Sequence, residues 1–208
     1  MILIGQYDSP FVRRVGIALT LYGLAFEHRP WSVFGDAEKI RPHNPLIRVP
    51  TLVLDDGEVM IESHSILDHL DSLVPADRAM FPVAEPARRQ ALKIAALATG
   101  LGEKAVSLFY EQRLHREVSD VWVQRCRVQI SGVLAVLEAD RVARPSAYWF
   151  GARIGHADIA VAAVLRFVAE AHPGLVAMAE FPALSAHAAR LEALPVFQAI
   201  EQPFIPPA

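Results

Sequence analysis

The sequence predicts an α/β domain followed by an all-helical domain, and three observations support this prediction. Strand-like and helix-like segments alternate through the N-terminal part, three prolines interrupt the chain between Val74 and Pro86, and helical periodicity dominates afterwards. Such alternation predicts a β-α-β unit with a mixed sheet, and a proline-rich stretch without periodicity predicts a linker. We therefore expect an α/β domain over residues 1–76, a linker over 77–86 and an all-helical domain over 87–208.

The first domain is expected to have the element order β-α-β-α-β-β-α. Apolar Val15, Leu19 and Tyr22 recur at helical spacing before Gly23, which indicates a helix and its end. A turn at residues 55–57 separates two short runs of β-forming residues, as in a hairpin. The expected elements are a strand at 2–5, a helix at 10–24, a strand at 25–31, a short helix at 36–43, hairpin strands on either side of 55–57, and a helix at 63–73.

The second domain is expected to be a helical bundle. Two long helices are marked by apolar residues at helical spacing, namely Ile94, Leu97, Ala98, Leu101, Ala105 and Leu108 in one and Cys126, Ile130, Val133, Leu134 and Leu137 in the other. Residues 158–171 are apolar on nearly all sides, which predicts the central, most buried helix. Two short helices at 184–194 and 196–200 are expected to complete the bundle.

Composition excludes several classes of protein. The net charge of −3 and the scattered Lys and Arg residues argue against nucleic-acid and membrane-surface partners. Cys126 is the single cysteine, so no internal disulfide is expected, and its apolar row predicts a buried, unreactive thiol. The sequence shows no secretory leader and no membrane span, so a soluble cytoplasmic protein is expected. His64 and His69 are five residues apart on one helix, which does not predict a metal site.

The stretch "RVPTLVLDDGEVMIES", residues 48–63, predicts a binding site at both ends of the hairpin. If the bond before Pro50 is cis, the polar backbone atoms of Val49 face outward and can pair with an extended peptide. The following helix begins near Ser63, where free N–H groups and a hydroxyl suit a carboxylate. Glu62 suits an ammonium group. The predicted ligand is therefore short and extended, with an amino-acid head group.

These residues, together with "YDSPFVRRVGIAL", "NPLIRVPTL" and "GHADIAVAAVL", resemble the serine-using classes of the cytosolic glutathione transferases. The resemblance implies a thioredoxin-like first domain that binds glutathione as co-substrate without a metal, and a two-fold homodimer. It places the glutathione site at Arg48, Val49, Pro50, Glu62 and Ser63. Two departures from the family pattern are Ile47, where glycine is common, and Gly155, where a Ser or Thr helix cap is common.

The resemblance places Ser9 at the position that stabilises the thiolate of glutathione. An unperturbed thiol has a pKa of about 8.5, and a hydrogen bond from a hydroxyl at a helix N-terminus favours the ionised form. The alternative role for Ser9 is structural, because Ser followed by Pro10 is also a good helix start. Tyr7 is a second hydroxyl nearby, and we expect it to be packed. A serine here argues against enzymes that form a mixed disulfide through cysteine.

The electrophile is expected between the domains, facing Ser9, with walls formed by Phe11, Phe34, Phe109, Tyr110 and Arg113. Core packing is the alternative role for these aromatic residues. Arg13 and Arg14 are expected on the surface, and His64 either borders the head group or is solvated. The predicted function is a glutathione transferase acting on a small electrophile. A glutathione-dependent isomerase or dehalogenase, and a non-catalytic glutathione-binding module, remain alternatives.

Overall fold

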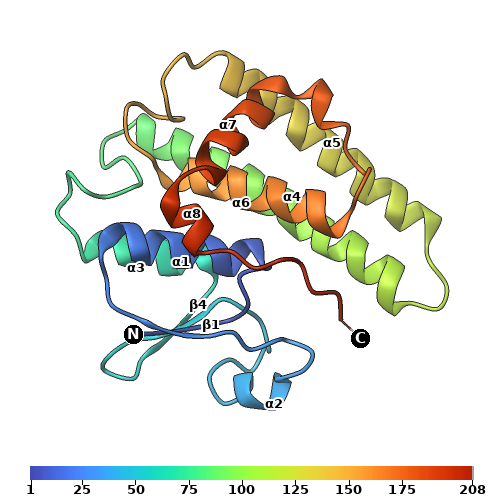
Figure 1. The fold of residues 1–208 in the computed structure, drawn as a ribbon, viewed down its shortest axis with the longest axis horizontal. Helices are drawn as coiled ribbons and strands as arrows, with labels where there is room; N and C mark the ends of the chain where they lie inside the picture. Colours follow the sequence, from blue (N-terminus) through green and yellow to red (C-terminus); the bar gives the residue numbers. More distant parts are fainter. Residues whose placement is uncertain (208) are drawn as a thin grey trace.

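A four-stranded mixed sheet forms the base of the first domain in the computed structural model, which describes residues 1–207 (Figure 1). The strands are β1 (Ile2–Ile4), β2 (Glu27–Arg29), β3 (Thr51–Val53) and β4 (Val59–Ile61), in the order β2-β1-β3-β4. β1 runs parallel to β2 and antiparallel to β3, which pairs with β4 as the predicted hairpin. The predicted α/β fold class is confirmed.

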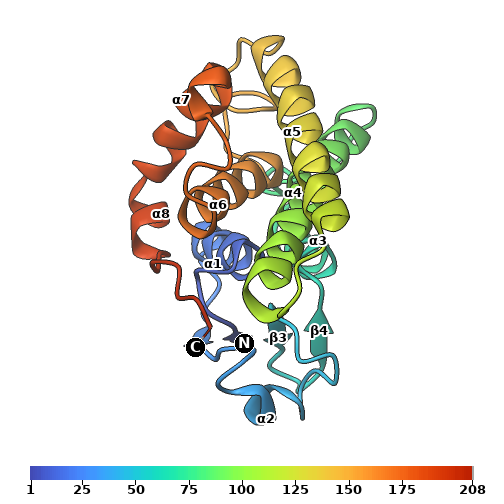
Figure 2. The same cartoon turned by 90° about the vertical axis from the view of Figure 1, so that its right-hand side faces the viewer.

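Three helices belong to this domain: α1 (Pro10–Tyr22), α2 (Ala37–Ile40) and α3 (Ser63–Ser72). Helix α1 begins after Ser9 and ends at Gly23, whose φ of 70° suits a residue without a Cβ. Helices α1 and α3 lie between the sheet and the second domain (Figure 2). Helix α2 is shorter than predicted, because Pro42 cannot donate the amide hydrogen bond that would extend it.

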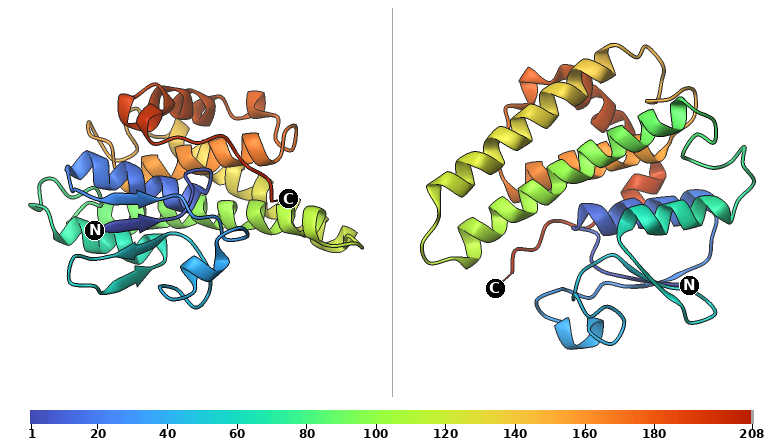
Figure 3. Two further views of the ribbon diagram at one scale, coloured as in Figure 1. Left: turned by 60° about the horizontal axis from the view of Figure 1, so that its bottom comes forward. Right: turned by 180° about the vertical axis from the view of Figure 1, so that it is seen from behind.

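The second domain is helical, as predicted, and is built around α6 (Figure 3). Its helices are α4 (Ala87–Leu114), α5 (Asp120–Val142), α6 (His156–Ala171), α7 (Pro182–Glu192) and α8 (Pro195–Ala199), with a 3-10 helix η1 (Met178–Glu180). Helix α6 is buried from His156 to Leu165 and packs against α1, α4 and α7. Residue 208, the end of the predicted second domain, lies outside the described residues.

The start of α6 explains why glycine replaces a hydroxyl cap. Asp158 accepts a hydrogen bond from the amide of Gly155 at 2.9 Å, which is the retained half of the predicted reciprocal cap. A Cβ at position 155 would lie 2.9 Å from the carbonyl oxygen of Met80. This close approach between the linker and α6 therefore disfavours Ser or Thr at position 155.

The prediction that Arg13 and Arg14 are surface charges is wrong. Their side chains are 2% and 0% exposed, respectively. Helix α1 is covered by the sheet and α3 on one side and by the second domain on the other, so it has almost no solvent-facing surface. Arg13 bonds Glu192 through both terminal nitrogens at 2.6 and 2.7 Å and donates to the carbonyls of Ile200 and Phe197 at 2.9 and 3.0 Å. These contacts tie α1 to α7 and α8.

The thiol of Cys126 is buried in the core of the second domain, as its apolar row predicted. None of the helices formed by residues 1–207 is both long enough and apolar enough to cross a membrane. Within the same residues, no group of three or more His, Cys, Asp or Glu side chains is placed to hold a metal ion.

Candidate functional site

The loop before β3 leaves one peptide group available to a ligand. The Val49–Pro50 bond is cis, and β3 begins at Thr51. Within residues 1–207, neither the N–H nor the C=O of Val49 makes a hydrogen bond. The loop is held by Asn44, which donates to the carbonyl of Arg48 at 3.0 Å and to the hydroxyl of Thr51 at 3.1 Å. The open backbone of Val49 can therefore pair with an extended chain.

The exit of the hairpin supplies polar groups for a charged head group. Glu62 has a φ of 66°, an uncommon conformation for a residue other than glycine and one often found at functional sites. Its side chain is exposed, while Ser63 at the start of α3 is 4% exposed. Arg48 lies 3.4 Å from Glu62 and 2.8 Å from Glu103 on α4, so it links this site to the second domain.

Ser9 is both a helix cap and a free hydrogen-bond donor. Its oxygen accepts from the amide of Val12 at 3.4 Å, as expected for a cap. Within residues 1–207, its hydroxyl proton has no acceptor, so it can donate to a ligand. Tyr7 is packed, as predicted: its ring stacks on His28 at 3.8 Å, and burial raises the pKa of Tyr7 to about 12.

The loop that carries Val49 and the first turn of α1, which begins after Ser9, meet at Gly5. A Cβ added to Gly5 would lie 2.5 Å from Val12, one turn after Ser9, and 2.7 Å from Val49. Gly5 has a φ of 128°, which also favours glycine. The absence of a side chain at position 5 therefore lets the cis-proline loop approach the first turn of α1.

Three of the five residues predicted to line the electrophile site lie together. The rings of Phe34 and Tyr110 meet edge to face at 5.6 Å, and Phe109 lies 6.3 Å from Tyr110. Phe11 instead packs against α4, where a Cβ on Gly102 would be 3.3 Å from its ring. Arg113 is exposed and donates to the carbonyl of Pro207 at 3.4 Å.

A further wall, which the sequence did not predict, comes from residues 201–207, here called the C-terminal strap. It leaves α8 and runs past the start of α1 toward the C-terminus (Figure 1). Gln202 accepts from the amide of Tyr7 at 3.3 Å, and the amide of Ile205 donates to Asp8 at 3.1 Å. Phe204 lies 5.0 Å from Phe109, ring to ring. The proline-rich "QPFIPP" was the available signal for an extended segment.

The side chain of His64 is partly buried and hydrogen-bonded. Its Nε2 lies 2.9 Å from the hydroxyl of Thr99 on α4, so the residue after Ser63 joins α3 to the second domain. Burial lowers the pKa of His64 to about 4, with smaller contributions from the charges of Arg14 and His156. His64 is therefore neutral at pH 7.

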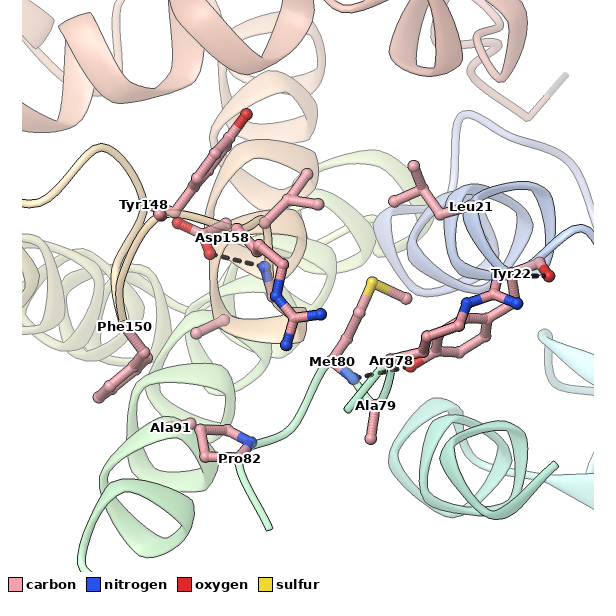
Figure 4. Close-up of a pocket in the computed structure, with 15 residues that line it drawn as sticks. Leu21, Tyr22, Arg78, Ala79, Met80, Pro82, Ala91, Tyr148, Phe150 and Asp158 are labelled. Atoms are coloured by element: carbon pink, nitrogen blue, oxygen red, sulfur yellow. Dashed lines mark hydrogen bonds between the residues drawn. The ribbon is translucent and has the colours of Figure 1, made fainter. Parts of the chain in front are cut away.

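A separate cavity of about 570 Å³ lies at the far end of α1 (Figure 4). It is lined by the C-terminal end of α1, the linker, the loop between α5 and α6 and the start of α6, and its residues include Tyr22, Arg78, Met80, Tyr148 and Phe150. Tyr22 is twelve residues after Pro10, which is about 18 Å at 1.5 Å per residue. This cavity is therefore remote from Ser9.

Comparisons with known proteins match both domains. A glutathione S-transferase N-terminal domain model matches residues 3–78, and a glutathione S-transferase C-terminal domain model matches residues 120–190. The uncharacterized GST-like protein YibF of Escherichia coli is 33% identical over 139 residues, which are 66% of this chain and 68% of that protein. Maleylacetoacetate isomerase of Pseudomonas aeruginosa is 34% identical over 94 residues, 43% of each protein.

A solved structure matches along the whole chain. A glutathione S-transferase of Methylobacterium radiotolerans, in complex with glutathione sulfonate, has a TM-score of 0.87 and 30% identity, and the match covers 100% of this chain and 98% of that chain. Both halves of the sequence thus match in order, and Ser9, Val49 and the residues at the exit of the hairpin lie in the half that matches the N-terminal domain. This protein belongs to the glutathione S-transferase family.

Proposed function

We propose that the protein is a glutathione transferase that stabilises the thiolate of glutathione with Ser9 for attack on a small electrophile. The observation that carries this proposal is the open backbone of Val49 in a loop that approaches the first turn of α1, where the Ser9 hydroxyl proton has no acceptor within residues 1–207. Glutathione is an extended tripeptide with a carboxylate and an ammonium at one end. The backbone of Val49 pairs with its cysteinyl residue, Glu62 and Ser63 receive the γ-glutamyl head, and the sulfur lies at Ser9.

The proposed chemistry depends on two groups that stabilise negative charge on sulfur, the Ser9 hydroxyl and the N-terminus of α1. Ser9 donates its proton as a hydrogen bond to sulfur, and the positive end of α1 adds to the same effect. Each unit by which the thiol pKa falls corresponds to about 1.4 kcal/mol, within the range of one charge-assisted hydrogen bond. The thiolate electron pair then forms the carbon–sulfur bond. The leaving group departs with its bonding electrons, or an addition product takes a proton from water.

Ser9→Ala tests this role with a chromogenic aryl halide as electrophile. We expect kcat/KM to fall by about 10- to 100-fold while glutathione affinity changes little, because the lost bond is made mainly to the thiolate. The pH dependence of kcat/KM should also shift to higher pH. Turnover of Ser9→Ala at the parent rate would refute the proposal.

Loss of a helix cap needs a matched control, because Ser9 also caps α1. Ser119 caps α5 in the same way, accepting from the amide of Trp122 at 3.3 Å. Ser119→Ala should cost about 1 kcal/mol of stability, as the cap at Ser9 does, and leave kcat/KM unchanged.

A glutathione-dependent isomerase is the second candidate, favoured by the similarity to maleylacetoacetate isomerase of Pseudomonas aeruginosa. Its reaction also begins with the glutathione thiolate, so Ser9→Ala would impair both activities. Assays of cis–trans isomerisation, halide release and aryl transfer with the same protein separate the isomerase, dehalogenase and transferase. Retention on immobilised glutathione without any turnover would instead identify a binding module.

The resemblance also supports a homodimer in the cytoplasm, and analytical ultracentrifugation tests the oligomeric state.

A further inference from the structure

The cavity at the far end of α1 has the size of a small-molecule site and takes no part in the proposed reaction. Its volume of about 570 Å³ falls within the roughly 300–1,000 Å³ that is typical of ligand pockets. Part of its lining is apolar and includes Leu21, Met80 and Ile154. A ligand bound there would contact α1, the linker and the segment that leads into α6 at the same time.

Two half-buried rings, those of Tyr148 and Phe150, form one wall of this cavity. They flank Trp149, which is 1% exposed and whose amide donates to Asp158 at 2.8 Å. The segment is therefore held at its centre, with a ring on each side of the buried residue. Figure 4 shows both rings on the same side of Met80. They offer a ligand contact with an aromatic or other flat apolar group.

Two guanidinium groups add positive charge to the lining. Arg78 donates to the carbonyl of Tyr22 at 3.1 Å, and Arg153 donates to the carbonyl of Asp77, which precedes Arg78. Within residues 1–207, neither arginine lies within ion-pair distance of a carboxylate. A guanidinium has five N–H donors, so most of them remain available. Both residues are exposed, which places them where the cavity opens to solvent.

The carboxylate of Asp158 also lines the cavity, but its oxygens are already engaged. One accepts from the amide of Trp149 at 2.8 Å and the other from the amide of Gly155 at 2.9 Å. Asp158 is 1% exposed and lies in the first turn of α6, where the helix dipole compensates its negative charge. The two arginines therefore leave the lining with a net positive charge, which favours an anionic ligand.

We propose that this cavity is a second binding site, separate from the glutathione site, for a small organic anion with an aromatic body. The carboxylate of the ligand pairs with Arg78 and Arg153 at the opening, and its aromatic part lies against Tyr148 and Phe150. The ligand binds without being turned over, because Ser9 is about 18 Å away along α1. No residue of the proposed glutathione site lines this cavity, so the inference does not depend on the proposed function.

Calorimetric titrations with 2-naphthoate and with its uncharged counterpart 2-naphthamide test the site. Saturating S-hexylglutathione is present to occupy the glutathione and electrophile sites. We expect the parent to bind one naphthoate with a Kd below about 1 mM and at least about fivefold more tightly than naphthamide. Arg78→Gln and Arg153→Gln should each weaken naphthoate binding by about three- to fivefold and leave naphthamide binding unchanged, as expected for exposed charge pairs.

Two further variants locate the bound naphthoate. Ala152 is exposed and lines the cavity, so Ala152→Trp fills the cavity from its rim and should abolish binding of both ligands. Arg89 is an exposed cation in the first turn of α4, pairs with Glu85 at 3.2 Å and does not line the cavity. Arg89→Gln is therefore the matched control and should leave the affinity for naphthoate unchanged.

The outcomes separate this inference from the proposed function. Equal binding of naphthoate and naphthamide by the parent would overturn the inference, as would loss of naphthoate binding when S-hexylglutathione is present. Naphthoate binding that persists unchanged in Ala152→Trp would place the ligand elsewhere and would also overturn it. Failure of S-hexylglutathione to bind would count against the proposed function alone, because Ala152→Trp and the arginine variants still locate naphthoate.

Discussion

Replacing Arg13 by methionine should destabilise the protein strongly, because Arg13 joins α1 to the last two helices. Its guanidinium is 2% exposed and makes four hydrogen bonds, two to Glu192 and one each to the carbonyls of Phe197 and Ile200. Methionine fills much of the volume but donates nothing. Two buried carbonyls and a carboxylate therefore lose their donors.

The magnitude follows from these lost bonds. Each buried acceptor left without a donor costs about 1–3 kcal/mol, and breaking a buried ion pair from one side costs about 3–5 kcal/mol. Glu192 is 27% exposed and lies 3.4 Å from Arg166, so part of its charge remains compensated. We expect a loss of about 3–5 kcal/mol, a large share of the 5–15 kcal/mol typical of folded domains.

Urea unfolding followed by circular dichroism measures this loss as a lower midpoint. The matched control is Arg29→Met, because Arg29 pairs with Glu27 at 2.7 Å on the surface. Surface ion pairs contribute little, so the control should unfold at nearly the parent midpoint. If the free energy of unfolding of Arg13→Met falls by less than about 1 kcal/mol, the argument that these Arg13 contacts stabilise the fold is refuted.

Two further predictions concern backbone strain and pH. Ile47 has a φ of 51°, a conformation that costs a β-branched residue about 1–2 kcal/mol, so Ile47→Gly should raise the free energy of unfolding by about 1 kcal/mol after the entropy cost of glycine. An unchanged or lower urea midpoint would contradict this. Because the pKa of His64 falls to about 4 from 6.5 on folding, the stability it contributes is present above pH 6.5 and is lost as the pH falls toward 4. His64→Gln should reduce the pH dependence of stability in this window by about one proton, and an unchanged slope in urea titrations would show that His64 is not the source.

The fold and the local geometry at the two ends of the hairpin could be predicted because their signals are local. The turn at 55–57, the cap at Ser9 and the adjacent Glu62 and Ser63 each depend on residues close in sequence. Local chemistry decides where strands turn and helices begin. The same reasoning found Val49 through its neighbour Pro50.

The burial of α1 and the contacts made by the C-terminal strap could not be predicted from local signals, and neither could the way in which Phe34 meets Tyr110. Arg13 and Arg14 resemble surface residues in a helix pattern, and only the docking of the second domain encloses them. Likewise, Phe34 meets Tyr110 although they lie in different domains, and Phe204 reaches Phe109 by way of the strap. These contacts depend on the placement of one domain against the other, which no single segment encodes.

The C-terminal strap has a consequence for how the protein is made. Gln202 meets Tyr7 across 195 positions of sequence, and Ile205 meets Asp8. Domains generally fold in order as they leave the ribosome. A nascent chain can therefore complete the first domain, to which we assign glutathione binding, long before residues 201–207 emerge to make their contacts with Tyr7, Asp8 and Phe109. Newly synthesised molecules should gain affinity for glutathione first and the capacity to enclose a second substrate last.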